Sequence, residues 1–82
     1  MATFHYVYIL VSGIDPNRHY TGCTDDLDTR LNAHNAGQVP HTAVHKPWRI
    51  DTAVAFSDRS KAITFERYLK SHSGRAFAKK HF

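Results

Sequence analysis

The 82 residues, of which 41% are hydrophobic, suffice for one compact core and exclude a disordered chain, so we expect a single domain over residues 1–82. One cysteine, Cys23, excludes an internal disulfide and a cysteine-based zinc site, and no apolar run is long enough to cross a membrane, so we expect a cytoplasmic protein. Eleven basic against seven acidic residues give a net charge of +4, which suggests a polyanionic partner.

The N-terminal segment is typical of a β-hairpin. Residues 4–11 (FHYVYILV) have apolar side chains on both faces, which predicts a central strand buried on two sides. Turn residues occupy positions 12–17 (SGIDPN), and a second strand pattern follows at residues 18–23 (RHYTGC). The short connection predicts antiparallel pairing, in which Tyr8 and Tyr20 lie on partner strands and can converge.

A helix is predicted after the hairpin. Thr24 or Asp25 can cap its N-terminus, and the helix is expected to run to about Asn35, with Gly37 as the stop signal.

Two polar side chains of this helix are expected to face the sheet. Leu27 and Leu31 define its apolar stripe, and Arg30 and His34 lie on or beside the same face. Arginine is suited to binding a phosphate, and histidine exchanges protons near neutral pH. For His34 the alternative is a half-buried histidine whose hydrogen bonds are satisfied.

The middle of the chain is predicted to be a loop followed by a strand. Residues 37–47 (GQVPHTAVHKP) show no periodicity, whereas residues 48–56 (WRIDTAVAF) alternate as expected of a strand with one buried face. His41 and His45 could join His34 in a zinc site, although no cysteine or carboxylate is obviously paired with them.

The rest of the chain is predicted to be helical. Ser57 or Asp58 can cap a second helix that continues to about Ser71, and a short basic helix begins at Ser73 or Gly74. The element order is therefore β-β-α-β-α-α, which is an α/β (α+β) arrangement.

The second predicted helix carries a carboxylate within its apolar stripe. Ala62, Phe65 and Leu69 follow an i, i+3, i+7 pattern, and Glu66 occupies the i+4 position. Because burying an unpaired carboxylate is costly, Glu66 needs a cation, either a divalent metal ion or a basic partner such as Arg30. A helix edge that reaches solvent is the remaining alternative.

The C-terminal third is basic and has no acidic residue after Glu66. Phosphate contacts are the commonest use of such a surface, and a solvated face is the alternative. The residues expected to bind nucleic acid are Arg67, Lys70, Arg75, Lys79 and Lys80.

Taken in order, these motifs resemble those of the GIY-YIG nucleases. Residues 6–8 (YVY) resemble the GIY element and residues 20–22 (YTG) the YIG element. The match continues through DLDTRLNAHN, which contains Arg30 and His34, then HT...KPW, Glu66 in FERYLK, and the ending GRAFAKKHF. It is closest to small bacterial single-domain proteins similar to the N-terminal nuclease domain of the nucleotide excision repair incision subunit.

The resemblance implies a three-stranded antiparallel sheet flanked by helices and a nuclease that uses Mg²⁺ or Mn²⁺ on nucleic acid, most readily DNA at branched or damaged structures. It implies that Tyr8, Tyr20, Arg30, His34 and Glu66 converge. Glu66 would hold the metal ion, Tyr20 would act as or relay to the general base, and Arg30 would stabilise the pentavalent phosphate. Tyr8 and His34 would orient or share the proton.

Three positions depart from the family pattern. Tyr6 stands in place of glycine and Thr21 in place of isoleucine, and no asparagine follows Glu66, where Ser71 or Ser73 would have to replace it. A non-catalytic nucleic-acid-binding module with the same fold is therefore an alternative, as is an adaptor whose basic tail docks an acidic protein. One site cuts a duplex through two events or as a homodimer, which leaves self-association open.

Overall fold

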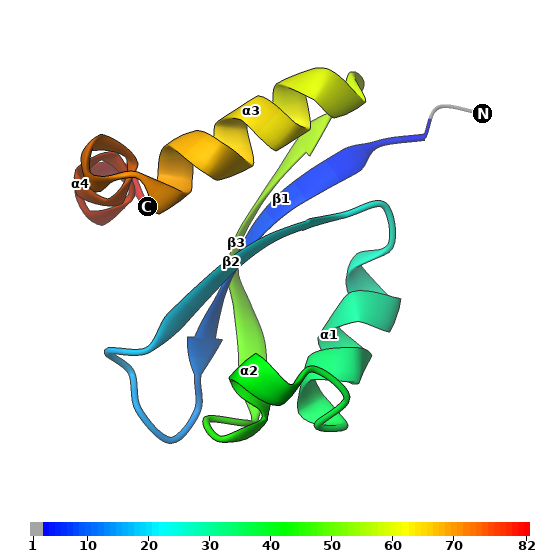
Figure 1. Cartoon of the computed structure of the whole chain (residues 1–82), viewed down its shortest axis with the longest axis vertical. Coiled ribbons are helices and arrows are strands. Elements are labelled where there is room, and N and C mark those ends of the chain that lie inside the picture. The colour runs from blue at the N-terminus through cyan, green and yellow to red at the C-terminus, as the bar shows by residue number, and fades with distance from the viewer. Residues whose placement is uncertain (1–2) are drawn as a thin grey trace.

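A three-stranded antiparallel sheet separates two layers of helices in the computed structural model, which describes residues 3–82 (Figure 1). The strands are β1 (His5–Ser12), β2 (His19–Thr24) and β3 (Trp48–Phe56), in the order β2-β1-β3. The central place of β1 explains its apolar side chains on both faces. The predicted α+β fold, the hairpin and the three strands are confirmed.

The four helices lie in pairs on opposite faces of the sheet, with α1 and α2 on one side and α3 and α4 on the other (Figure 1). Their bounds are α1 (Leu27–Asn35), α2 (Pro40–Ala43), α3 (Arg59–Lys70) and α4 (His72–His81). None of the helices in the described part of the chain is long and apolar enough to span a membrane.

The helix starts differ in detail from those predicted. Asp26 caps α1 in place of Thr24 or Asp25, because its carboxylate accepts hydrogen bonds from both the backbone N–H and the hydroxyl of Thr29. The same bonds hold the pKa of the Asp26 carboxyl below its usual value. Asp58 caps α3, as predicted.

Two further helix predictions need correction. The segment predicted as loop contains α2, a single turn that begins at Pro40, whose ring presets the backbone angle needed at a first helical position. The terminal helix begins at His72, earlier than predicted, because the Ser71 hydroxyl caps it by accepting from the Gly74 N–H. Gly37, the predicted stop signal, follows the end of α1 with a φ of 76°.

Each face of the sheet has its own apolar core. One cluster joins the sheet to α3 and α4 through Val7, Ile9, Ala62 and Leu69, with Phe56, Phe65 and Phe77 packed against it. The other joins the sheet to α1 through Tyr8, Leu10 and Trp48, with Tyr20, Leu27, Leu31 and Ile50 around it.

A bulge in β3 corrects the prediction of one buried face. Ile9 pairs with Thr52 but Leu10 pairs with Ile50, so Asp51 is an extra residue in the ladder. Because of this extra residue, the apolar side chains of β3 before the bulge point to one face of the sheet and those after it point to the other. Trp48 therefore packs in the α1-side core, whereas Phe56 packs in the α3-side core.

Candidate active site at the edge of the sheet

Four of the predicted site residues converge beside the edge strand β2. Tyr8 comes from β1, Tyr20 from β2, and Arg30 and His34 from α1. The ring centroids of Tyr8 and Tyr20 are 6.4 Å apart, and those of Tyr20 and His34 are 4.9 Å apart. Side chains from positions 8 to 34 of the sequence thus form one cluster.

Gly22 explains how Tyr8 reaches this cluster. The two residues are direct partners in the β1–β2 ladder, and the Tyr8 ring lies over the glycine. A Cβ at position 22 would collide with the Tyr8 hydroxyl and would be 2.5 Å from Cζ. The glycine of the YTG motif therefore leaves the space through which the Tyr8 hydroxyl extends toward α1.

The Tyr8 hydroxyl connects the cluster. It lies 3.1 Å from His34 Nε2 and accepts a hydrogen bond of 3.4 Å from Arg30 Nε, although Tyr8 is only 2% exposed. Burial raises the pKa of Tyr8, and the bond from Arg30 partly offsets that rise. The same bond raises the pKa of Arg30, so its guanidinium is firmly charged.

His34 is fully buried and bonded at both ring nitrogens. Its Nδ1 lies 2.7 Å from the hydroxyl oxygen of Thr42, a residue of α2 that sequence reasoning did not single out. Burial lowers the pKa of His34, and the positive charge of Arg30 lowers it further. His34 is therefore neutral near pH 7. The only sequence signal for Thr42 was its place in the HT pair that resembles the family.

Glu66 approaches from the opposite layer of the molecule. It lies on α3 with a side chain 20% exposed, and its carboxylate is 3.1 Å from the ammonium of Lys70, one helical turn on. Lys70, and not Arg30, is therefore its basic partner. Its negative charge adds to the effect of burial in raising the pKa values of Tyr8 and Cys23.

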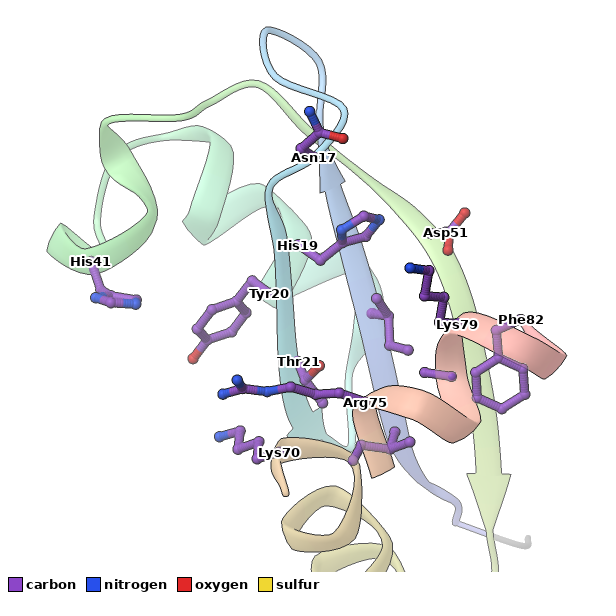
Figure 2. Close-up of a pocket in the computed structure, with 13 residues that line it drawn as sticks. Asn17, His19, Tyr20, Thr21, His41, Asp51, Lys70, Arg75, Lys79 and Phe82 are labelled. Atoms are coloured by element: carbon purple, nitrogen blue, oxygen red, sulfur yellow. The ribbon is translucent and has the colours of Figure 1, made fainter. Parts of the chain in front are cut away.

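Lys70, Arg75 and Lys79 share a cleft with Tyr20. The cleft has a volume of about 760 Å³ and lies between the sheet and the two C-terminal helices, with Ile9 and Leu69 among its apolar lining residues (Figure 2). Figure 2 shows the Lys70 and Arg75 side chains projecting from these helices beside β2, whereas Lys79 lies next to Asp51 of β3. Arg67 and Lys80, also predicted to bind nucleic acid, are exposed but do not line it. The polar lining residues that sequence reasoning did not assign to the site are Asn17, His19, Thr21, His41 and Asp51.

Cys23 and Ser71 have structural roles. The Cys23 side chain is partly buried against the α3-side core, and burial raises the pKa of its thiol. Ser71 caps α4 and also donates to the Tyr68 carbonyl oxygen. Among residues 3–82, no three His, Cys, Asp or Glu side chains gather into a group that could hold a metal ion, which includes the three histidines considered for zinc.

Comparison with known proteins agrees with this fold. The family model described as the GIY-YIG catalytic domain matches residues 4–80, and the chain therefore belongs to that nuclease superfamily. It is similar to small proteins named UPF0213. It is 34% identical over 74 residues to UPF0213 protein HQ_3675A of Haloquadratum walsbyi, a match that covers 89% of this chain and 81% of the relative.

Two further relatives extend this comparison. UPF0213 protein YazA of Bacillus subtilis is 34% identical over 71 residues, which are 85% of this chain and 71% of that protein. The solution NMR structure of UPF0213 protein BH0048 from Bacillus halodurans aligns with a TM-score of 0.56 at 32% identity, covering 93% of this chain and 80% of that one.

Proposed function

We propose that this protein is a metal-dependent nuclease that hydrolyses phosphodiester bonds in nucleic acid, with DNA as the expected substrate and the cytoplasm as the expected compartment. The observation that carries this function is the cluster of Tyr8, Tyr20, Arg30 and His34 beside a cleft with three cationic side chains. A phosphate bound there has cations to receive its charge and hydroxyl groups to orient a water molecule.

The two tyrosines differ in exposure, and this difference indicates different roles for them. Tyr8 is buried and its hydroxyl is engaged by Arg30 and His34, whereas Tyr20 is half-buried and lines the cleft. Tyr20 is therefore the tyrosine whose hydroxyl can contact an attacking water, as or relaying to the general base. Arg30, held by Tyr8, is the group that stabilises the phosphate's developing charge through its planar fork of donors.

Glu66 is the residue that would hold the divalent ion. It is a single, partly exposed carboxylate, and such a donor suits Mg²⁺ or Mn²⁺, because Mg²⁺ keeps several of its waters when protein carboxylates are few. When bound, the ion would act as a Lewis acid toward a phosphate oxygen. The Lys70 ammonium now neutralises the carboxylate and would have to move aside.

The decisive experiment is cleavage of labelled single-stranded, duplex and branched DNA with Mg²⁺, with Mn²⁺ and with a chelator. Glu66→Gln keeps the side-chain volume and removes the charge, so it should abolish metal-dependent cleavage by a folded protein. Tyr20→Phe should lower the single-turnover rate by about 10² to 10⁴. Arg30→Lys should also lower it, because lysine lacks the planar fork.

Tyr6→Phe is the matched control for loss of a tyrosine hydroxyl. Tyr6 is half-buried on β1, and its ring packs near Phe4, outside the cluster. The Tyr6→Phe variant should cleave DNA at the wild-type rate. If Tyr20→Phe and Arg30→Lys fold normally and cleave like Tyr6→Phe, the assigned roles are wrong.

A non-catalytic nucleic-acid-binding module is the second candidate function. It is favoured by the Glu66–Lys70 pair, which neutralises the carboxylate without a metal ion. Binding of DNA at low salt, with no cleavage of any of the three DNA forms in either metal, would support this module over the enzyme. Absence of binding would favour an adaptor with an acidic protein partner.

A further inference from the structure

Thr42 lies behind the candidate site and has no part in the roles assigned above. Its hydroxyl oxygen is 2.7 Å from His34 Nδ1 and 3.2 Å from the carbonyl oxygen of Val39. Thr42 is 1% exposed and His34 is fully buried, so these groups must satisfy one another. Trp48 fixes the position of Thr42 by donating from its indole N–H to the Thr42 carbonyl oxygen at 2.8 Å.

The direction of these hydrogen bonds follows from their donors. A threonine hydroxyl has one hydrogen to donate, and a carbonyl oxygen can only accept. The bond to Val39 therefore uses the hydrogen of Thr42. The Thr42 oxygen must then accept from His34, which places the imidazole hydrogen on Nδ1.

The other side of the imidazole leads to the same tautomer. Arg30 Nε can only donate to the Tyr8 oxygen. Within the part of the chain that the structure describes, His34 Nε2 is the one acceptor within hydrogen-bonding distance of the Tyr8 hydrogen. A hydrogen on Nε2 would leave the buried Tyr8 hydroxyl without an acceptor, which is costly. His34 Nε2 therefore carries no hydrogen and acts as the acceptor.

We propose that Thr42 is a positioning residue that holds His34 in the Nδ1–H tautomer, so that bare Nε2 accepts the Tyr8 hydrogen and the Tyr8 oxygen keeps its lone pairs for Arg30. Each group then donates to the next in one direction, from the Arg30 guanidinium through Tyr8 of β1 and His34 of α1 to Thr42 of α2. The effect on cleavage rests on the proposed function, because it acts through the placement of Arg30 against a phosphate. The tautomer itself does not depend on that function.

The tautomer can be measured directly by ¹⁵N NMR of the His34 side chain, at about pH 8 where histidine is ordinarily neutral. Wild type should show a protonated Nδ1 and a bare Nε2. Thr42→Ser keeps the hydroxyl and should keep this state. Thr42→Val replaces the hydroxyl by a methyl group that cannot accept. Each tautomer then leaves one buried hydrogen without an acceptor, so the Nε2–H form should become populated beside the Nδ1–H form. Thr42→Ala tests the same loss if the valine variant fails to fold.

Single-turnover cleavage on the same samples tests the consequence. We expect Thr42→Val to be slower by about 10- to 100-fold, as is typical when a group that orients a site residue is lost. Thr42→Ser should stay close to wild type, whereas a merely structural role would lower the melting temperature without changing the tautomer. An Nε2–H tautomer in wild type, or an unchanged tautomer in folded Thr42→Val and Thr42→Ala, would overturn the role of Thr42. If the tautomers are as expected but the wild-type protein does not cleave DNA, the nuclease function is overturned and the role of Thr42 in setting the tautomer is kept.

Discussion

At the scale of single residues, the site depends on close packing around the Tyr8 hydroxyl. Gly22 makes room for the ring, and Arg30 and His34 bond its oxygen from α1. Each contact joins residues distant in sequence, so a small change in any side chain displaces the others.

Gly22→Ala should damage both stability and activity. Its Cβ would meet the Tyr8 ring at distances no real contact tolerates, so either the ring or β2 must move. Overpacking of this kind costs about 1 to 3 kcal/mol, and the displaced Tyr8 hydroxyl should release Arg30. Chemical denaturation and single-turnover cleavage measure the two effects. Wild-type stability would mean that the ring does not lie over position 22.

His34 should make stability depend on pH. Its pKa is lowered in the folded protein from the ordinary value of 6.5, chiefly by burial, so below pH 6.5 the unfolded chain binds more protons than the native state. The free energy of unfolding should therefore fall as the pH drops through the interval between 6.5 and the folded pKa, and rise with pH across it. Above that interval His34 is neutral in both the folded and the unfolded state, so it does not contribute to the change of the free energy of unfolding with pH.

Melting temperatures measured across this pH interval test the sign of the pH dependence of stability. His34→Gln should lose part of the acid-side slope, whereas His72→Gln, a change at an exposed position of α4, should keep it. Equal slopes in both variants would show that His34 is not the source.

At the scale of secondary-structure elements, α3 serves both the core and the candidate metal site. Ala62 and Leu69 face the sheet, while Glu66 and Lys70, four residues apart, form an ion pair at the border with solvent. The helix thus holds a carboxylate whose negative charge acts on Tyr8, and it supplies its own counter-charge in Lys70.

Lys70→Gln should strengthen binding of Mn²⁺ to the protein without DNA. The ammonium competes with the ion for Glu66, and its removal should tighten binding by about two- to fivefold, since an exposed ion pair is worth at most about 1 kcal/mol. Lys61→Gln, at an exposed position on the same helix, is the control. Electron paramagnetic resonance of free Mn²⁺ gives both affinities, and equal values for the two variants would exclude competition by Lys70.

At the scale of the whole molecule, the site forms where the two helical layers can both reach the sheet. Arg30 and His34 come from the α1 layer, whereas Glu66 and the cationic wall of the cleft come from the α3 and α4 layer (Figure 1). A sheet separates its two faces everywhere except at its edges. The edge strand β2 is therefore the place where, in the proposed function, groups from both layers would act on one phosphate.

Lys79 and Lys80 are neighbours on α4 that test the course of the nucleic acid. Lys79 lines the cleft and Lys80 does not, although both are exposed. Lys79→Gln should weaken DNA binding and reduce the slope of log affinity against log salt by about 1, the value for one lost phosphate contact. Lys80→Gln should leave that slope unchanged. Equal losses in the two variants would place the nucleic acid outside the cleft.

The sequence by itself determined the three strands, the helices α1, α3 and α4 and their order, because those depend on local chemistry, whereas α2 was missed. Alternation and turn residues predicted the hairpin and gave the bounds of β3, and Asp58 was identified as a cap of α3. The family motifs also identified the candidate residues, and the structure brings four of them together at β2. Their catalytic roles stay predictions.

Tertiary structure alone decided how these groups are paired. The bulge at Asp51 changes the face of β3 although the apolar alternation is unbroken, because an extra residue in a ladder shows only against its partner strand. Glu66 pairs with Lys70, and Thr42 bonds His34 from a segment without periodicity. Hydrogen bonds and steric fit depend on distances in space, and a linear pattern does not contain them.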